Sequence, residues 1–309
     1  MKKKILIVGG SGFVGTNILK KINKEKYKLF ATRFTGKNFY KSPKIKYFKG
    51  DLKNLQFCKK ITRSIDEIIM CAAVSSGAMV IQNNPMYHVN DNIIMNLNLL
   101  KAAEKNKVKK FIFLSSNTVY PAGKKSMVEN DLNYKLFSKY FNVGWMKIFS
   151  EKLCEMYKKK MKICIIRPAN LYGPHDKFDP VRSKVIPALI RKFENQKIVE
   201  VWGSGKDIKD FLYIDDFVNN LLSVKDKIKH FEVLNISSSK SVSLKEIIKI
   251  LKKIYVKKNV KIVFNSNKPS MIPFRRINNS KIKKLIKFKL NYSLESGLRK
   301  TVDWYKKNK

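Results

Sequence analysis

Three glycines near the start of the chain constrain its fold more than any other feature of the sequence. An apolar, β-branched run at residues 4–8 leads directly into them, and a helical pattern follows at 17–22. This order predicts a strand, a tight turn and a helix. Glycines at 9, 12 and 15 let the backbone turn sharply and let a pyrophosphate approach the helix N-terminus. We therefore predict a dinucleotide-binding loop, formed by Gly9, Ser11, Gly12, Phe13, Val14 and Gly15.

Strand and helix patterns alternate along the rest of the chain. Further β-rich apolar runs lie at 27–32, 46–48, 68–73 and 110–116. Such alternation is typical of a doubly wound parallel sheet. The chain, at 309 residues, is long enough for one large core and a smaller lobe. We predict an α/β protein with a Rossmann-type sheet (1–171, to which 210–236 return) and a smaller C-terminal α/β substrate-binding lobe (172–209 and 237–309).

Basic residues at the end of the second strand bear on the choice of cofactor. Arg33 ends the run, and Lys37 follows in the next loop. NAD sites usually place an acidic residue there for the ribose hydroxyls, whereas an arginine suits the 2′-phosphate of NADP. We therefore predict NADP, with NAD as the alternative. The residues expected along the cofactor follow the third and fourth strands: Asp51, Leu52, Ala72 and Ala73.

The chain is strongly basic, with 66 Lys+Arg against 23 Asp+Glu and a net charge of +43. Nucleic acid is the first partner that such a charge suggests. The lysines are spread through the whole chain, however, and no segment interleaves clustered basic residues with aromatic residues that would stack on bases. We attribute the charge to the lysine-favouring bias of an AT-rich genome and do not predict nucleic-acid binding. A positive field would still attract anionic nucleotide sugars.

The patterns of cysteine, histidine and apolar residues argue against a disulfide-rich, metal-binding, membrane-spanning or secreted protein. The four cysteines have no paired short spacing and the three histidines are scattered, so neither a disulfide framework nor a metal site is predicted. No apolar run approaches the roughly 20 residues of a membrane span. Only residues 5–8 are apolar before the first glycine, which is too short for a secretory signal. We expect a cytoplasmic protein.

Longer motifs resemble those of a known family. The chain carries SNTVYP at 116–121, RPANLYGP at 167–174 and LESGL at 294–298. These resemble signatures of the extended short-chain dehydrogenase/reductases, also called the NAD-dependent epimerase/dehydratase family. Within it, YGPHDKFDP at 172–180, VIPALIRKF at 185–193 and VWGSG at 201–205 are most similar to the GDP-L-fucose synthase branch. That branch combines 3,5-epimerisation with NADPH-dependent 4-keto reduction of GDP-4-keto-6-deoxy-D-mannose.

The resemblance implies roles for individual residues. Ser116 matches the serine that hydrogen-bonds the sugar oxygen undergoing redox, Lys147 the lysine that holds the nicotinamide ribose, and Asn92 an asparagine that supports the site. Pro168 falls at a cofactor-binding position. The positions implied to contact the nucleotide sugar are Asn170, Lys184, Arg191, Trp202, Lys209 and Arg276. The synthases have arginine where this chain has Lys209, so the charge is kept but the bidentate fork is lost.

Three positions that carry chemistry depart from the synthases. Thr118 and Lys184 stand where the branch has the cysteine and histidine of its epimerisation acid/base pair. Val143 stands where the branch has tyrosine, four residues before Lys147, a spacing that places both on one helix face. Threonine has no useful pKa near neutrality, and valine cannot transfer a proton. Full 3,5-epimerisation is therefore not expected, although Lys184 alone could still donate a proton or bind phosphate.

Reduction of a sugar ketone then needs another proton donor. One interpretation is that Ser116 or Thr118 relays a proton from water. Another is that Tyr140 donates the proton. Tyr140 would share the helix face of Lys147 but lie one turn, roughly 5 Å, beyond the usual position of the tyrosine. We predict an NADP-dependent oxidoreductase that reduces or forms a 4-keto group on a sugar nucleotide. The resemblance implies that the nucleotide is GDP and that the protein is a homodimer. The alternatives are a catalytically impaired paralogue that binds NADP and nucleotide sugar as a partner or regulator, and an RNA-binding member of the fold.

Overall fold

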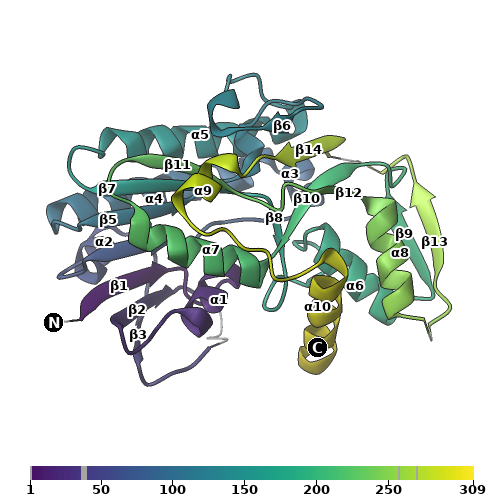
Figure 1. The fold of residues 1–309 in the computed structure, drawn as a ribbon, viewed down its shortest axis with the longest axis horizontal. Coiled ribbons are helices and arrows are strands. Elements are labelled where there is room, and N and C mark those ends of the chain that lie inside the picture. The colour runs from purple at the N-terminus through teal and green to yellow at the C-terminus, as the bar shows by residue number, and fades with distance from the viewer. Residues whose placement is uncertain (1, 36–39, 257, 269–270) are drawn as a thin grey trace.

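Seven parallel strands form the central sheet of the protein (Figure 1). The computed structural model describes residues 2–309 except 36–39, 257 and 269–270. The strand order is β11-β7-β5-β4-β1-β2-β3. The strands are β1 (Lys3–Val8), β2 (Tyr27–Arg33), β3 (Ile45–Lys49), β4 (Glu67–Met70), β5 (Lys110–Leu114), β7 (Lys162–Pro168) and β11 (Glu232–Ile236).

Helices cover both faces of this sheet, so its strands are apolar on both sides. Alternate residues of β1 belong to two separate cores. Ile5 and Ile7 pack in the core that includes residues of α1 (Phe13–Lys21) and α7 (Ile214–Lys227). Leu6 and Val8 pack in the core that includes residues of α2 (Leu55–Ile61), α4 (Asn90–Lys105) and α5 (Phe141–Met156). The prediction of a doubly wound parallel sheet is confirmed.

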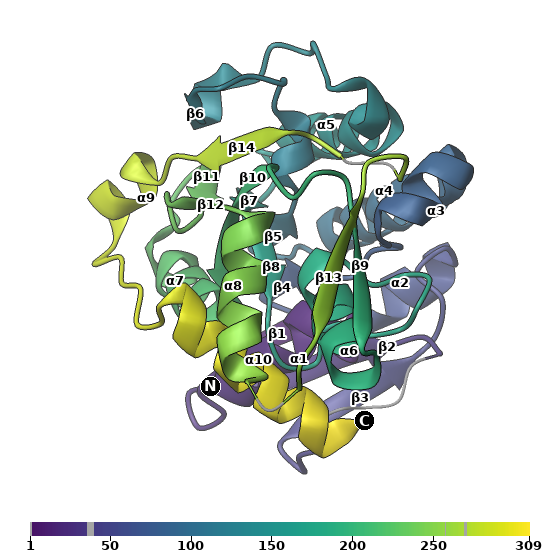
Figure 2. The same ribbon diagram turned by 90° about the vertical axis from the view of Figure 1, so that its right-hand side faces the viewer.

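A second group of strands and helices lies at one side of the large sheet (Figure 1) and faces the viewer in Figure 2. One sheet has the order β12-β10-β14-β6 with β8 also paired to β10, and a separate pair joins β13 to β9. The strands are β6 (Ser126–Met127), β8 (Asn170–Tyr172), β9 (Ile198–Trp202), β10 (Ile208–Tyr213), β12 (Ser241–Ser243), β13 (Lys261–Asn265) and β14 (Phe274–Ile277). The helices α6 (Val185–Asn195), α8 (Leu244–Ile254) and α10 (Leu294–Asn308) pack on one another, and α9 (Ser280–Leu285) packs on β11.

Short helices occupy the loops that follow the strands of the large sheet. They are α3 (Ala78–Asn83), η1 (Pro85–His88), η2 (Asn117–Val119), η3 (Glu129–Asp131) and η4 (Ser138–Tyr140). The fourth and fifth strands end at Met70 and Leu114, earlier than the sequence predicted. Ala72, Ala73 and Ser116 therefore lie in loops at the carboxyl edge of the sheet, where ligands bind in open α/β folds.

The structure also gives information on membrane-spanning helices, disulfides and metal sites. No helix in the described part of the chain is long and apolar enough to cross a membrane. The four cysteines carry free thiols. Among the described residues, no group of His, Cys, Asp and Glu is placed to hold a metal ion. The division into a sheet domain and a substrate lobe at the residue numbers given above stays a prediction, although β11 does return to the large sheet.

Candidate active site

The glycine loop joins β1 to α1 with almost no space between backbone segments. Gly9 has φ +83°, in the left-handed region that favours glycine. Its N–H donates to Thr32 Oγ1 at 2.8 Å, and the N–H of Gly10 donates to Thr32 O at 2.8 Å. A Cβ atom on Gly15 would lie 2.2 Å from Gly9 O. The third glycine is therefore required for the close approach of helix and loop.

The N-terminus of α1 fits a pyrophosphate. Gly12 is the N-cap residue, no side chain in the described structure caps it, and the first turn contains no acidic residue. The N–H groups of that turn and the positive end of the helix dipole therefore face the loop without a competing anion. A Cβ on Gly9 would lie 2.7 Å from the backbone of Ala72, which places the loop after β4 directly against the glycines.

The predicted adenosine end of the cofactor lies at the edge of the sheet. The N–H of Gly50 donates to Arg33 O at 3.1 Å, so the residues that follow β3, Asp51 and Leu52, lie beside Arg33. Asp51 is partly exposed, and Leu52 is buried. Lys37 lies outside the described residues. The glycine loop thus fits a nicotinamide dinucleotide, and Arg33 lies at the end of β2, where the sequence predicted contact with the cofactor's ribose.

Replacing Gly15 by alanine is expected to weaken binding of NADPH at least tenfold and to destabilise the fold by about 1–3 kcal/mol, because the new methyl group overlaps Gly9 O. Fluorescence titration with NADPH and a thermal melt measure the two effects. Gly123→Ala is the matched control, since its nearest contact would be Met127 Cε at 3.4 Å. Unchanged NADPH affinity in Gly15→Ala would contradict the assigned role of the loop.

Ser116 and Thr118 lie on the turn η2, directly after β5. Ser116 Oγ accepts a hydrogen bond from Thr118 N at 3.2 Å and so caps this turn. Thr118 Oγ1 is buried, and among the described residues it has no hydrogen-bond partner. Asn117 Nδ2 donates to Pro168 O at 3.0 Å. The predicted serine, threonine and proline thus meet at the carboxyl ends of the neighbouring strands β5 and β7.

Lys147 extends from α5 to the end of β5. Its Nζ donates to Leu114 O at 2.9 Å and lies 4.9 Å from the centre of the Phe113 ring. Burial, with a smaller contribution from the positive charge of Lys184, lowers the pKa of Lys147 to about 8. The ammonium group is thus held beside the backbone that leads into Ser116.

Gly144 brings the helix of Lys147 close to η2. A Cβ on Gly144 would lie 2.8 Å from Thr118 O and 2.7 Å from Leu136 Cδ1. Val143 precedes this contact by one residue and lies one helical turn before Lys147. Val143, where the resemblance implies a tyrosine, therefore lies close to η2 on the helix face that carries the lysine.

A buried ion pair holds α5 against the sheet one turn beyond Lys147. Glu151 and Arg167 are both buried and form a bidentate pair, with Nη2–Oε2 at 2.6 Å and Nε–Oε1 at 3.0 Å. Ser115 Oγ also donates to Glu151 Oε1. Arg167 Nη1 donates to Tyr120 Oη at 3.1 Å and to Glu129 O at 2.8 Å. This network connects the helix of Lys147 to the residue next to Ser116.

The loop before α6 brings Lys184 toward the same site. Lys184 is the N-cap residue of α6, and its charge acts on both Lys147 and Asp176. Asp176 is buried, and its Oδ2 has no hydrogen-bond partner in the described structure. Burial raises the pKa of Asp176 to about 6, against the opposing effects of Lys184 and Lys177. Lys184 is therefore close enough for its charge to affect both Lys147 and Asp176.

Tyr140 lies in a different environment. Burial raises the pKa of its hydroxyl to about 12, and the charges that act on it are those of Arg275 and Asp207. The charges that act on Lys147 come from Glu151 and Lys184 instead. Tyr140 is thus associated with the smaller sheet, and its use as a substitute donor stays a prediction.

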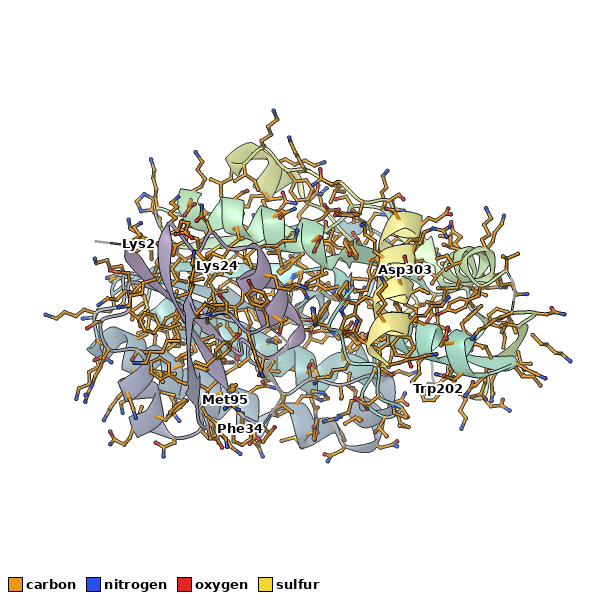
Figure 3. The ribbon with its side chains drawn as sticks, turned by 90° about the horizontal axis from the view of Figure 1, so that it is seen from below. Lys2, Lys24, Phe34, Met95, Trp202 and Asp303 are labelled. Atoms are coloured by element: carbon orange, nitrogen blue, oxygen red, sulfur yellow. The ribbon has the colours of Figure 1, made fainter. Side chains whose placement is uncertain are left out.

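The predicted substrate-binding residues come from two places. Asn170, Lys209 and Arg276 lie on strands of the smaller sheet, where Asn170 Nδ2 donates to Asp210 O at 2.9 Å and Lys209 pairs with Asp207 at 3.7 Å. Arg276 is exposed, and its Nε donates to Ser241 Oγ at 3.1 Å. Arg191 on α6 and Trp202 at the end of β9 lie outside this sheet. Figure 3 shows Trp202 far from Phe34, the neighbour of Arg33.

Several residues of the site were not predicted from the sequence. Arg275 is buried, and its guanidinium donates to Pro121 O at 2.9 Å and to Tyr120 O at 3.0 Å, which ties β14 to the turn after Thr118. Only its neighbour Arg276 was predicted. Glu151 had a signal that could have identified it, because it lies four residues after Lys147 on the same helix face. Asp176 lay within a quoted motif but was given no role.

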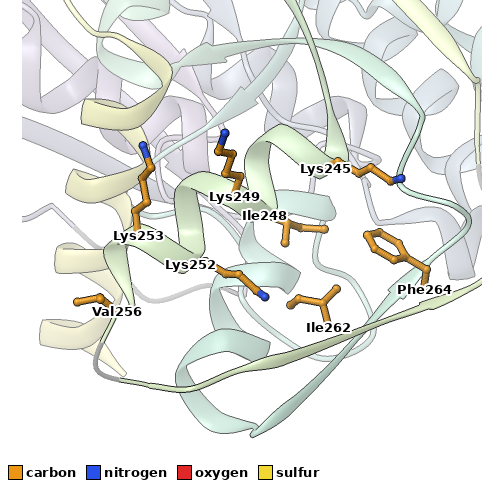
Figure 4. A pocket seen from close by; sticks show the side chains of 8 residues that line it. All are labelled: Lys245, Ile248, Lys249, Lys252, Lys253, Val256, Ile262 and Phe264. Atoms are coloured by element: carbon orange, nitrogen blue, oxygen red, sulfur yellow. The ribbon is translucent and has the colours of Figure 1, made fainter.

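A surface hollow of about 600 Å³ lies apart from these residues, between α8 and β13 (Figure 4). Ile248, Ile262 and Phe264 are among the residues that line it, and Lys245 Nζ lies 5.6 Å from the centre of the Phe264 ring. None of the residues predicted for the site lines it. The hollow is therefore separate from the candidate active site.

These features define a Rossmann-fold, nicotinamide-dependent enzyme. They are the parallel sheet, the uncapped glycine loop, and the ammonium group that Lys147 of α5 places at the end of β5. The model of the NAD dependent epimerase/dehydratase family matches residues 5–237. The chain belongs to this family, as its motifs predicted.

Known proteins resemble the chain over most of its length. It is 28% identical over 316 residues to the putative GDP-L-fucose synthase 2 of Arabidopsis thaliana, covering 99% of this chain and 92% of that protein. It is 29% identical over 264 residues to the GDP-L-fucose synthase of Escherichia coli strain K12, covering 79% of this chain and 81% of that protein. The solved UDP-N-acetylglucosamine 4-epimerase from Methanobrevibacter ruminantium M1, in complex with UDP-N-acetylmuramic acid, has a TM-score of 0.88 at 23% identity and covers 100% of both chains. At that identity, the likeness shows the fold alone.

Proposed function

We propose that the chain is an NADP-dependent oxidoreductase that reduces a 4-keto group on a GDP-linked sugar, or forms one in the reverse direction. The observation that carries the proposal is the Lys147 ammonium at Leu114 O, two residues before Ser116, on the sheet that also carries the glycine loop. The names of the relatives, which are GDP-L-fucose synthases, support a GDP-linked substrate. Arg33 at the end of β2 supports NADP over NAD.

Side chains of the protein orient the reacting carbonyl of the sugar and stabilise the charge that develops on its oxygen. Ser116 Oγ is an available donor to the sugar oxygen, because in the structure it serves as an acceptor from Thr118 N. The Lys147 ammonium stabilises negative charge that develops there. A bound nicotinamide would supply the hydride. Val143 leaves the proton to be delivered by another group.

Epimerisation at C3 and C5 needs an acid/base pair on the two sides of the sugar. Thr118 Oγ1 is a poor base, and Lys184 stands where the synthases have the histidine of the pair. We therefore propose reduction or oxidation without epimerisation. The buried, unpartnered Thr118 hydroxyl remains suited to hydrogen-bond a sugar hydroxyl.

The test is to incubate the purified protein with NADPH and GDP-4-keto-6-deoxymannose in D₂O. We expect NADPH to be consumed and the product to carry no deuterium at C3 or C5, because carbon-bound protons are not exchanged. Deuterium at both carbons would show that epimerisation persists. Tight binding of both ligands with no turnover, on this or related keto sugars, would instead identify the catalytically impaired paralogue.

We also propose a homodimer, formed through α4 and α5. Phe141, Trp145 and Phe149 are exposed at four-residue spacing on α5, and Ile94 and Leu97 are exposed on α4. These two helices pack side by side, so the exposed side chains form an apolar face that a second copy would cover.

Replacing Phe149 by lysine is expected to convert the dimer to a monomer, because two charges would then be buried where two copies meet. Sedimentation velocity measures the change. Val256→Lys is the matched control, since Val256 is also apolar and exposed but lies after α8. A wild-type protein that sediments as a monomer would contradict the proposal.

A further inference from the structure

A buried histidine and serine are hydrogen-bonded at the carboxyl edge of the large sheet. His88 ends η1 and is 3% exposed, and Ser76, in the loop after β4, is 8% exposed. His88 Nε2 lies 2.8 Å from Ser76 Oγ. His88 Nδ1 is buried, and it has no hydrogen-bond partner in the part of the chain that the structure describes. Nothing in the proposed function uses this pair.

The loop that carries Ser76 packs against the segment that leads into Lys184. Lys177 Nζ donates to Ser75 O at 3.0 Å. A Cβ on Gly77 would lie 2.3 Å from Ser183 O. Both neighbours of Ser76 therefore contact the segment that leads into Lys184. The strand that precedes this loop pairs directly with β5, the strand that leads to Ser116.

The turn that carries His88 packs beside the position of the missing tyrosine. Residues of η1 contact α5, and Asn142 Nδ2 lies 3.5 Å from Met86 Sδ. Asn142 is the residue before Val143. Asn92 fixes both segments, because its Nδ2 donates to His88 O at 2.6 Å and to Val74 O at 2.9 Å. Asn92 thus ties the turn of His88 to the loop of Ser76, next to α5.

We propose that Ser76, supported by His88, delivers to the sugar oxygen the proton that Val143 cannot supply. The inference rests on the proposed reduction. As the C4 carbonyl carbon accepts a hydride, Ser76 Oγ–H gives its proton to the C4 oxygen and takes one from protonated His88 Nε2. His88 then recovers a proton from water. One C–H and one O–H bond form on the sugar, the reduced cofactor loses a hydride, and solvent loses one proton.

The surroundings of His88 set the pH dependence of this step. Burial, and then the positive charge of Lys177 on the neighbouring loop, lower the pKa of His88 below its usual value near 6.5. The Tyr87 ring packs against the imidazole edge-on at 5.1 Å. Because only protonated His88 can deliver a proton, we expect kcat for reduction to rise as pH falls toward that lowered pKa.

The test uses His88→Gln and Ser76→Ala, each alone and combined with Val143→Tyr. Each single variant is expected to lower kcat about 10²-fold, with KM and NADPH affinity unchanged. Adding Val143→Tyr to either single variant is expected to raise its kcat at least tenfold, since the tyrosine returns a proton donor to α5. The control is His230→Gln, because His230 is exposed after α7.

A readout independent of turnover is the NMR titration of the His88 imidazole. Its pKa should lie below 6.5 in the wild type and should shift in Ser76→Ala. Single variants that turn over like the wild type would overturn the inference and leave the proposed function standing. Lost activity that Val143→Tyr does not restore would show a structural role and also overturn it. A wild type without turnover would reject the proposed function, and the inference with it.

Discussion

Replacing Lys147 by methionine is expected to lower kcat/KM for the keto sugar by about 10²–10⁴-fold. The substitution removes the ammonium that donates to Leu114 O beside Ser116, whereas the methionine side chain keeps the length and apolar character of the lysine stem. Steady-state rates with NADPH measure the loss. Lys152→Met is the matched control, because Lys152 is exposed on the same helix and pairs with Glu155. Activity retained in Lys147→Met would remove Lys147 from the reacting centre.

The same side chain predicts two pH effects. Since the pKa of Lys147 is about 8, kcat/KM should fall as pH rises through that value and the ammonium loses its proton. The free energy of unfolding should respond in the opposite direction. Between pH 8 and roughly 10.4, the unfolded chain holds a proton that the folded chain has lost, so stability rises with pH over this interval. That rise should be absent in Lys147→Met.

Replacing Glu151 by alanine is expected to destabilise the protein by about 3–5 kcal/mol, because it leaves the buried Arg167 charge unpaired. It also removes the acceptor of Ser115. Chemical denaturation measures the change. Glu155→Ala is the matched control, since Glu155 lies on the surface of the same helix and forms exposed pairs with Lys152 and Lys158, which are worth about 0–1 kcal/mol. Equal effects of the two variants would contradict the assigned importance of the buried pair.

Local patterns in the sequence predicted the cofactor half of the molecule well. The strand, glycine loop and helix at residues 3–21 form as predicted, because the loop requires glycine at fixed short spacing. The resemblance implied roles for Ser116 and Lys147, and the fold brings Lys147 Nζ to the end of β5, the strand that leads into Ser116. Local spacing was sufficient to predict the strand, loop and helix.

Contacts between distant segments could not be predicted in the same way. Ser76 and His88 are twelve residues apart in sequence, on two loops with no repeating pattern, and their hydrogen bond depends on how Asn92 orders both. Arg275 and Arg276 are adjacent, and only the pleat of β14 decides that the first is buried and the second exposed. Tyr140 precedes α5 by one residue, so the helix period did not fix the direction of its side chain.

The network around Glu151 has a consequence for how this chain can evolve. Its hydrogen bonds join Ser115, Tyr120, Glu129 and Arg167, and none of them involves position 143. The scaffold that aligns the lysine and serine is therefore maintained whichever side chain occupies that position. Selection can add or remove the proton donor at a single site while the ligand-binding framework stays intact. A lineage with such a framework can exchange one chemistry for another, or silence it, without first losing its fold.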